Sequence, residues 1–263
     1  MPQMGKAGAP VTNISQAYAD RVEVRGRDLC EEIMGKLTFT EYFHLLLTGT
    51  EPTEDQRFFL DLLLIAIAEH GMMPSNVAAR MTLDTTPDSL HGAVAAGILG
   101  CGPVILGTSE ACALLLAEAQ EEVEAGGEAG GVASELAAGI RESGGYVPGF
   151  GHPVHRPHDP RAERILELAS ERGVSGPHAL LARAFHDAVT EARGKPITMN
   201  VSMPIAAVML DLSFPPTAVK GVPILARTGG LIAHLAEEQG RPIGFLMAGV
   251  AEDAITYESE REG

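Results

Sequence analysis

Three histidines recur at intervals of three in the segment "GFGHPVHRPHDPRAERILELA", at His152, His155 and His158. His-x-x-His-x-x-His superficially resembles a metal-binding pattern. Two intervening prolines exclude a helix here, and in an extended chain this spacing does not bring the rings together without a special turn. We therefore expect no metal at this segment, and loop histidines without a role are the alternative.

The residues that follow favour an anion-binding site. A helix is expected to begin after Asp159 as its N-cap, with Pro160 at the first helical position and Gly173 after the end. Helix N-termini bind carboxylates and phosphates through free N–H groups and the positive end of the helix dipole. Arg161 adds a planar fork suited to a carboxylate, and His152 follows a Gly-Phe-Gly approach that lets the backbone come close to a ligand.

The elements that must position these residues are predicted to be helical, and the fold class all-α. The stretch "TEDQRFFLDLLLIAIAEHG" opens with Thr53 and Gln56, a capping-box pair, and ends at Gly71. Similar helical spacing of apolar residues continues through most of the chain, whereas β-type alternation is limited to short pieces such as "VEVRG".

Glycine and proline breaks divide this pattern at 124–135, 144–160 and 194–200. They suggest a smaller, mobile helical subdomain carried on a larger domain. The predicted organisation begins with an N-terminal tail at 1–20. A large helical domain is made of two segments, 21–130 and 201–263, and a small helical subdomain covers 131–200. The small residues of 92–102 predict close helix packing, either within the chain or across a dimer interface.

Composition limits the classes of function. The chain has 263 residues, and 45% of them are hydrophobic, which is enough for one large domain or two modest ones. The formal net charge of -16 argues against nucleic acid and anionic membranes as partners, although a few arginines can still make one cleft positive. Three cysteines without a C-x-x-C motif, and no apolar run long enough to span a bilayer, lead us to expect a cytoplasmic protein.

Several motifs together resemble the citrate synthase family. "GFGHPVHRPHDPRA" resembles its Gly-Phe-Gly-His segment before an Asp-Pro-Arg-Ala helix start, and "AEHGMMPSN" its Ala-Glu/Asp-His segment. "GPVILGTSEA" resembles its Gly-rich loop, and "ARTGGLIAHLAEEQ" its late Ala-Arg-Thr-x-Gly segment. The resemblance is collinear over 22–240. It is greatest to the compact citryl-CoA lyase branch, which shares its fold with the C-terminal module of ATP-citrate lyase.

The resemblance implies a role for each matching residue. His70 and His152 would bind and polarise the oxo or hydroxy group of a dicarboxylate-like unit, and Arg161 and Arg227 would clamp its carboxylates. Without the resemblance, His70 is equally well interpreted as a histidine that balances the dipole at a helix end. Arg227 is equally well interpreted as one partner of an ordinary surface ion pair. His234 either orients the helix of Arg227 or lines the site. A homodimer or dimer of dimers is also implied, with no cofactor apart from the coenzyme A of the substrate.

Two positions depart from the family pattern. Ile105 stands where the Gly-rich loop usually has a histidine, which the lyase branch also tends to lose. Ser202, in "MNVSMP", stands where the family has its general-base aspartate. A serine hydroxyl has no useful proton affinity near neutrality, so it cannot simply replace that carboxylate. The nearby acids Asp211 and Glu110 are not at the matching position.

Three functions follow as hypotheses. The first is a carbon–carbon lyase that splits a 3-hydroxy-3-carboxyacyl-CoA, such as citryl-CoA, into an acyl-CoA and an oxo acid such as oxaloacetate. His70 and His152 would serve the oxygen end, and Ser202 would hydrogen-bond the enolate or place a water. The second is a condensing enzyme that runs the same chemistry in reverse on an unusual oxo acid. The third is a non-catalytic homologue that binds CoA esters. The partners expected are a CoA thioester and a small carboxylic acid.

Overall fold

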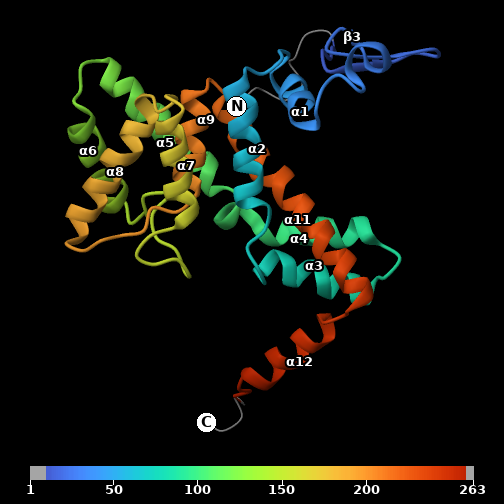
Figure 1. Ribbon diagram of the computed structural model, residues 1–263. Coiled ribbons are helices and arrows are strands. Elements are labelled where there is room, and N and C mark those ends of the chain that lie inside the picture. The colour runs from blue at the N-terminus through green and yellow to red at the C-terminus, as the bar shows by residue number, and fades with distance from the viewer. Residues whose placement is uncertain (1–9, 259–263) are drawn as a thin grey trace. The chain divides into compact units, whose positions relative to one another are not determined.

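The computed structural model describes residues 10–258, and helices dominate this range (Figure 1). The all-α prediction is confirmed. The chain forms two compact units that divide after Asp61, inside α2 (Glu54–Ala68). No described helix combines the length and the low polarity that crossing a bilayer requires.

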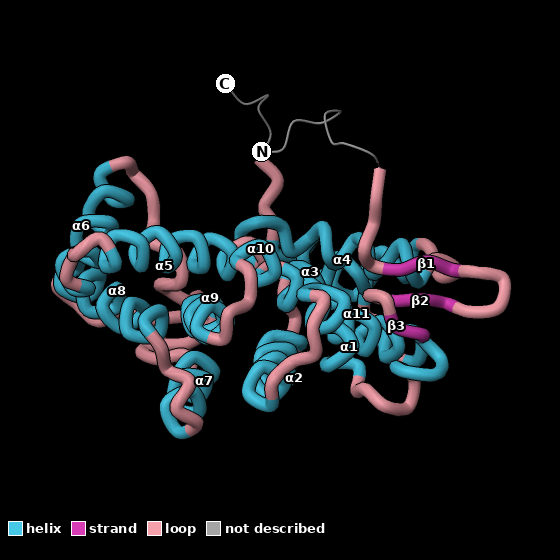
Figure 2. Tube along the Cα trace, turned by 90° about the horizontal axis from the view of Figure 1, so that it is seen from above, coloured by secondary structure: helices cyan, strands magenta, loops and turns pink. Residues whose placement is uncertain are grey.

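The first unit contains a small antiparallel sheet followed by helices. Figure 2 shows the three strands side by side in the order β1-β2-β3, and Ser15 of β1 pairs with Val24 of β2. A small core beneath them is formed by Val24, Ile33 and Leu45. The elements before α2 are β1 (Ser15–Ala17), β2 (Val22–Val24), β3 (Arg27–Asp28), the π-helical turn η1 (Leu29–Ile33) and α1 (Phe39–Thr48).

The second unit contains the remaining helices. One group packs around a core of alanine and leucine side chains and consists of α3 (Pro74–Thr85), α4 (Leu90–Ile105), α11 (Gly221–Gly240) and α12 (Gly244–Ala254). The other group consists of α5 (Thr108–Glu124), α6 (Ala129–Glu142), α7 (Pro160–Glu171), α8 (Pro177–Arg193), α9 (Ser202–Asp211) and α10 (Pro216–Val219). Helix α9 is the centre of the second group, because its residues 202–209 are all buried and it packs against α5, α7 and α8.

The predicted division into tail, large domain and small subdomain stays a prediction. Residues 1–9 of the expected tail lie outside the described residues, and 15–17 form β1. The expected small subdomain, 131–200, contains most of α6 together with α7 and α8.

Local sequence signals placed the helix starts well, whereas α2 ends at Ala68, three residues before the predicted stop at Gly71. The capping box is present, since the Thr53 amide donates to Oε1 of Gln56 at 2.9 Å and the Gln56 amide donates back to Oγ1 of Thr53 at 3.2 Å. Helix α7 begins at Pro160, with the carboxylate of Asp159 accepting from a first-turn amide, and Gly173 follows its end with a φ of 69°. These signals depend only on neighbours in the sequence, so they can be read without knowledge of the fold.

Glycines allow α11 to lie very close to its neighbours. A Cβ at Gly97 of α4 would lie 2.6 Å from the Cδ2 atom of Leu231, so the small residues of 92–102 serve packing within the chain at this point. A Cβ at Gly230 would lie 2.1 Å from the carbonyl oxygen of Ala68, the last residue of α2. The contact at Gly230 therefore fixes α11 against the chain that leads into His70.

Gly230→Ala is expected to destabilise the protein by about 2 kcal/mol or more, because a backbone oxygen cannot yield as a flexible side chain can. The adjacent Gly229→Ala is the matched control, since a Cβ there meets nothing within 4 Å. Alanine is favoured over glycine in a helix interior by about 1 kcal/mol, so the control should be neutral or stabilised. Urea unfolding midpoints compare the two. Equal midpoints would show that the contact with Ala68 does not constrain α11.

Candidate functional site

A cavity of about 250 Å³ in the second unit gathers most of the predicted site residues. Four of them line it: His152, Arg161, Ser202 and Arg227. The fifth, His70, adjoins it, with its ring centroid 5.3 Å from that of His152. Among the described residues that line this cavity there is no aspartate or glutamate. The cavity therefore presents two arginines to a ligand, although Arg161 is also paired with Asp159, which does not line the cavity.

The Gly-Phe-Gly segment is held in place by pairing with residues 198–200. The Gly151 amide donates to the Thr198 carbonyl at 2.7 Å, and the Asn200 amide donates to the Gly149 carbonyl at 2.8 Å. Gly149 has a φ of 84°, and a Cβ there would lie 2.8 Å from Cβ of Met203. Only glycine fits such a position without strain or displacement. The close packing against α9 thus sets the place of the histidine that follows.

His152 has a defined tautomer. Its Nδ1 accepts the backbone amides of Val154 at 3.0 Å and His155 at 2.8 Å, so this nitrogen carries no proton in the neutral ring. The proton of the neutral ring must then lie on Nε2, which makes His152 a hydrogen-bond donor at that atom. Burial lowers the pKa of His152 below its ordinary value of 6.5, and the charge of His155 adds to the shift. His152 is therefore a neutral donor near pH 7.

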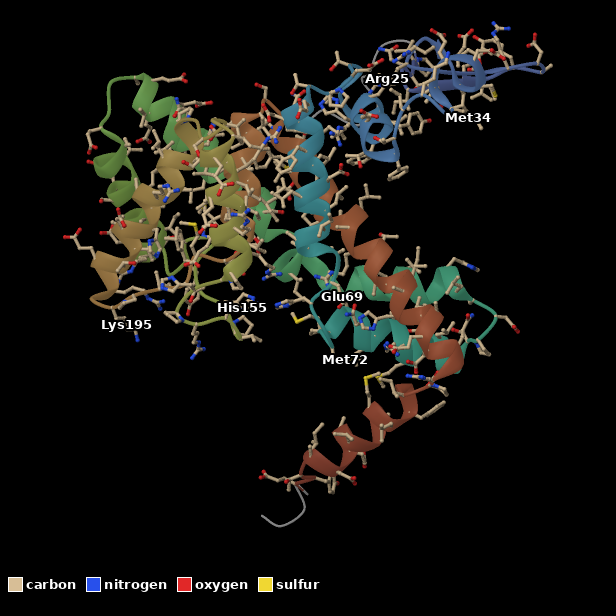
Figure 3. The ribbon with its side chains drawn as sticks, in the orientation of Figure 1. Arg25, Met34, Glu69, Met72, His155 and Lys195 are labelled. Carbon is tan, nitrogen blue, oxygen red and sulfur yellow. The ribbon has the colours of Figure 1, made fainter. Side chains whose placement is uncertain are left out.

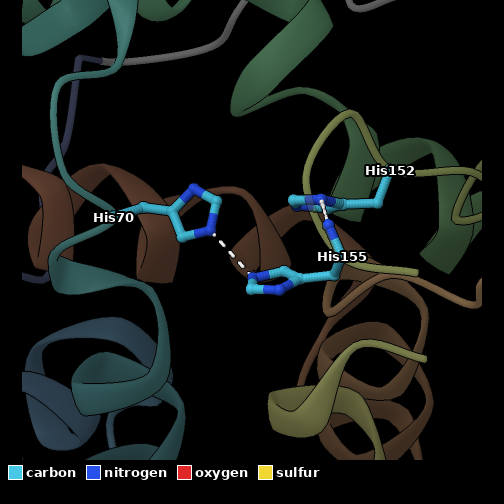
Figure 4. Close-up of side chains that lie close together, drawn as sticks. All are labelled: His70, His152 and His155. Atoms are coloured by element: carbon cyan, nitrogen blue, oxygen red, sulfur yellow. Dashed lines mark hydrogen bonds between the residues drawn. The ribbon is translucent and has the colours of Figure 1, made fainter. Parts of the chain in front are cut away.

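His70 and His155 face each other across the site. Their Nε2 atoms lie 3.0 Å apart, and Figure 4 shows this contact beside the ring of His152. His70 belongs to the link between α2 and α3, whereas His155 belongs to the loop before α7. Burial lowers the pKa of His70, with further lowering from the charges of Arg161 and His155. His70 is therefore also neutral in the ligand-free site near pH 7.

The three imidazoles lie close enough for one metal ion, because one ring nitrogen from each lies within 4.8 Å of the others. The tautomer of His152 opposes that use. Its Nδ1 lone pair is engaged by two amides and its Nε2 carries the proton, so the neutral ring has no free lone pair for a metal. The absence of a metal site stays a prediction, and this tautomer is the physical argument for it.

The spacing argument was wrong about two of the three histidines. His152 and His155 do converge, with ring centroids 4.4 Å apart, because the chain turns back so that two amides reach the His152 ring. His158 is exposed and lies apart from them, with Nδ1 3.1 Å from the Glu163 carboxylate.

Arg227 is buried without a partner for part of its guanidinium. Its side chain lies on α11, the residue is 3% exposed, and Nε and Nη1 have no hydrogen-bond acceptor among the described residues. Buried charged donors are otherwise almost always hydrogen-bonded, since desolvation without a partner is unfavourable. The alternative of a surface ion pair does not fit these contacts, and the guanidinium has donors to offer to a ligand or to water.

Arg161 is oriented by the residue that caps its own helix. The Asp159 carboxylate accepts from Nε of Arg161 at 3.0 Å and from Nη2 at 2.9 Å, and it also accepts the Arg161 and Val201 amides. Although burial alone would raise the pKa of Asp159, the hydrogen bonds from Arg161 outweigh it and the pKa is lowered. Asp159 is thus a fixed anion, and its two contacts with the guanidinium use Nε and Nη2 of Arg161.

Ser202 is the first residue of α9 and is buried at the cavity wall. The acids considered as replacements for a base lie elsewhere and are engaged. Asp211 accepts three backbone amides at the start of α8 together with Nδ1 of His178, and Glu110 pairs with Lys220 at 2.8 Å. Neither of these acids can therefore replace the family aspartate, and the carboxylate that does lie beside this position, that of Asp159, is engaged by Arg161 and the Val201 amide.

A polar network behind His70 was not anticipated from the sequence. The Glu69 carboxylate accepts the His70 amide at 2.7 Å and the Gly71 amide at 2.8 Å, and it lies 2.8 Å from Nε2 of His234. Nδ1 of His234 accepts from Nε of Arg80 at 3.0 Å, so its proton lies on Nε2 and points at Glu69. Figure 3 shows Glu69 in the link between α2 and α3. His234 therefore orients the His70 segment and does not line the cavity.

Comparison with known proteins decides the family. The family described as "Citrate synthase, C-terminal domain" matches residues 9–244. The chain belongs to the citrate synthase family. The citrate synthase of Deinococcus radiodurans is 28% identical over 207 residues, covering 76% of this chain and 52% of that protein. The chain spans about half the length of the curated relatives it matches.

Solved structures of two lyases superpose on nearly the whole of this chain. The citryl-CoA lyase of Hydrogenobacter thermophilus superposes with a TM-score of 0.83 at 28% identity and covers 97% of both chains. An ATP citrate lyase of Methanosaeta concilii, in complex with (3S)-citryl-CoA, superposes with a TM-score of 0.76 at 21% identity and covers 98% of this chain and 43% of that one. The second likeness concerns the fold alone. The resemblance to the citrate synthase superfamily and its compact citryl-CoA lyase branch is confirmed.

In this member of the citrate synthase family, Glu69→Gln should loosen the His70 segment. A carboxamide cannot accept from both the backbone amides and His234, so we expect about 1 kcal/mol of destabilisation near pH 7, reduced by the partial exposure of Glu69. The pKa of Glu69 is lowered, because hydrogen bonds from His234 and the His70 amide outweigh burial. Its stabilisation is thus present above the ordinary value of 4.5 and is lost as pH falls through the lowered pKa. Unfolding free energies of both proteins, measured from pH 7 to 3, should converge; a constant difference would contradict this account.

Proposed function

We propose that this chain is a citryl-CoA lyase-like enzyme that cleaves a 3-hydroxy-3-carboxyacyl-CoA, citryl-CoA or a relative, into an acyl-CoA and a 2-oxo acid such as oxaloacetate. The observation that carries the proposal is the buried guanidinium of Arg227, which has donors without acceptors at a cavity that holds a second arginine. A carboxylate accepts from such a fork in bidentate geometry. A substrate with carboxylates at two positions would engage Arg227 and Arg161 together.

A neighbouring basic cavity supports a CoA thioester as the form of the substrate. A cavity of about 620 Å³ shares Gly151 and His152 with the first one, so the two meet at the His152 loop. Its wall includes Arg156, Arg193 and Lys195, although the chain as a whole is strongly acidic. Clustered cations of this kind suit the phosphates of coenzyme A. The thioester would then lie near His152, with the nucleotide end on the basic residues.

The residues of the site can be assigned to the steps of cleavage. Arg227 and Arg161 would hold the carboxylates, and Nε2–H of His152 would donate to the oxygen on the substrate's tertiary carbon. His70 would take the proton of that hydroxyl. The O–H electrons then form the carbonyl of the oxo acid, while the electrons of the broken carbon–carbon bond form the thioester enolate. Ser202 would donate to the enolate oxygen or place the water that protonates its carbon.

Condensation remains the second candidate, because curated relatives carry the name citrate synthase. The same groups would act in reverse, since a catalyst accelerates both directions. The likeness to a citryl-CoA lyase over nearly the full length of both chains favours cleavage as the main activity. Assay of a panel of CoA thioesters, with both cleavage and condensation products detected, separates these candidates from a non-catalytic homologue.

Assembly and location stay proposals as well. A homodimer or dimer of dimers is supported by α12, which exposes the side chains of Phe245, Leu246 and Val250. Apolar groups gathered on one short helix are typical of a surface that another chain covers. The predicted cytoplasmic location rests on the sequence argument given above.

Arg227→Met tests the carboxylate clamp. Loss of the guanidinium should weaken binding of oxaloacetate or citrate by about 2–5 kcal/mol, because the ligand's carboxylate is left unpaired. The ligand-free variant should be as stable as the wild type or more so, since the substitution removes a buried donor without an acceptor. Titration calorimetry and urea unfolding measure the two effects. Arg164→Met, on the exposed side of α7, is the control and should bind normally. Unchanged affinity in Arg227→Met would remove Arg227 from the site.

Ser202→Asp tests the missing base. Because a serine cannot abstract the α-proton of acetyl-CoA, the wild type should exchange its methyl protons with deuterium poorly and should be a poor citrate synthase. Ser202→Asp should increase the exchange if the pocket admits the longer anionic side chain. Deuterium uptake into acetyl-CoA, followed with an oxo-acid analogue present, makes the comparison. Fast exchange by the wild type would identify another residue as the base.

A further inference from the structure

We propose that His155 is the proton-relay partner of His70: the two imidazoles form one chain that takes the substrate's hydroxyl proton at one end and holds it away from the reacting oxygen. This inference rests on the proposed cleavage and gives a role to a residue that the family motifs did not mark. His155 acts through His70, so it is a positioning and relay residue and need not touch the substrate.

The contact between the rings requires a shared proton. Two Nε2 atoms 3.0 Å apart form a hydrogen bond only if one of them carries a hydrogen and the other does not. In the neutral pair, the ring that accepts has its proton on Nδ1, and the ring that donates has an unprotonated Nδ1. Of the two Nδ1 atoms in the pair, one therefore always has a lone pair that can accept a proton, and the other always carries a hydrogen.

The arrangement is built by the chain around His155. The His155 amide donates to His152, and Oγ1 of Thr198 donates to the His155 carbonyl at 3.2 Å, so the backbone is held on both sides of the ring. The same Thr198 also donates to the Pro157 carbonyl at 2.9 Å. The ring of His155 thus lies beside both of the other rings, at centroid distances of 5.2 Å from His70 and 4.4 Å from His152.

Burial and the surrounding charges disfavour a charge that stays on His70. Arg161, Arg227 and His155 all disfavour a charge on His70, which Asp159 favours only weakly. His155 in turn contributes to the low pKa of the Asp159 carboxylate, so a charge on His155 is attracted by that anion. His152 is the other titratable ring in contact with the pair and is held as a neutral donor.

The relay conserves protons, because His70 gains one proton from the substrate and passes another to His155. When Nδ1 of His70 takes the hydroxyl proton, the hydrogen on Nε2 of His70 moves to Nε2 of His155. His70 is neutral again, with its proton on Nδ1, and His155 becomes the imidazolium. Protonation of the enolate carbon and return of the stored proton to solvent complete the cycle without net change.

His155→Gln is the decisive variant, because glutamine keeps a hydrogen-bond partner for His70 but cannot carry the proton on. For citryl-CoA cleavage we expect kcat to fall by about 10²-fold with KM little changed, on the scale of acid–base effects. The acid limb of kcat/KM should move to higher pH, because loss of the His155 charge raises the pKa of His70. His158→Gln, which alters the exposed histidine of the same loop, should behave as the wild type.

Two further measurements separate a relay from a structural role. His70→Gln and the double variant with His155→Gln should have equal kcat, since His155 acts only through His70. In the ligand-free protein, NMR titration of the wild type should show His70 and His155 titrating as a coupled pair, whereas His70 in His155→Gln should titrate in one step at higher pH.

Independent titration of the two rings, or full activity of His155→Gln in an active enzyme, would overturn the proposal. Absence of thioester cleavage by the wild type would contradict the proposed function. The titration would still decide whether the two rings share a proton.

Discussion

One face of α11 organises the site. Arg227, Gly230, His234 and Glu238 recur at helical spacing on this face. Arg227 reaches the cavity, Gly230 lies against the end of α2, and His234 contacts the Glu69 carboxylate. Glu238 pairs with the buried Arg80 and accepts the amides that begin α12. A displacement of α11 would therefore move Arg227 and the His70 segment together.

In the second unit, the carboxylates near the site are engaged by other groups of the chain. The acids near the site are each committed: Asp159 to Arg161, Glu69 to backbone amides and His234, and Asp211 to the start of α8. The cavity itself is left with cationic and neutral donors. In a chain of net charge -16, a local excess of positive groups is how an anionic substrate can be drawn into the site.

Sequence reasoning recovered what depends on near neighbours. The Thr53 capping box and the Asp159 start of α7 need only residues within four positions, and both were read directly. The role of Arg161 was suggested by its place at a helix start, whereas that of Arg227 came from motif resemblance alone, because no local rule tells a buried arginine from an exposed one. The contact of Arg80 with His234 joins residues 154 positions apart, and a single sequence carries no signal for such a pair. His155 was missed because the convergence of the loop depends on a ring nitrogen that accepts two amides.

Under the proposed cleavage, the absence of a carboxylate at position 202 and the presence of His155 would be two parts of one chemical arrangement. A carboxylate is suited to removing a weakly acidic α-proton, which condensation requires first. Cleavage requires first that a hydroxyl proton be removed, and a neutral imidazole with a lowered pKa is available for this near pH 7. In the proposed cleavage, one histidine that donates, His152, and a histidine pair that accepts would provide both functions at a single oxygen. If cleavage is the reaction, Ser202 stands in place of a family aspartate that the first step of cleavage would not use.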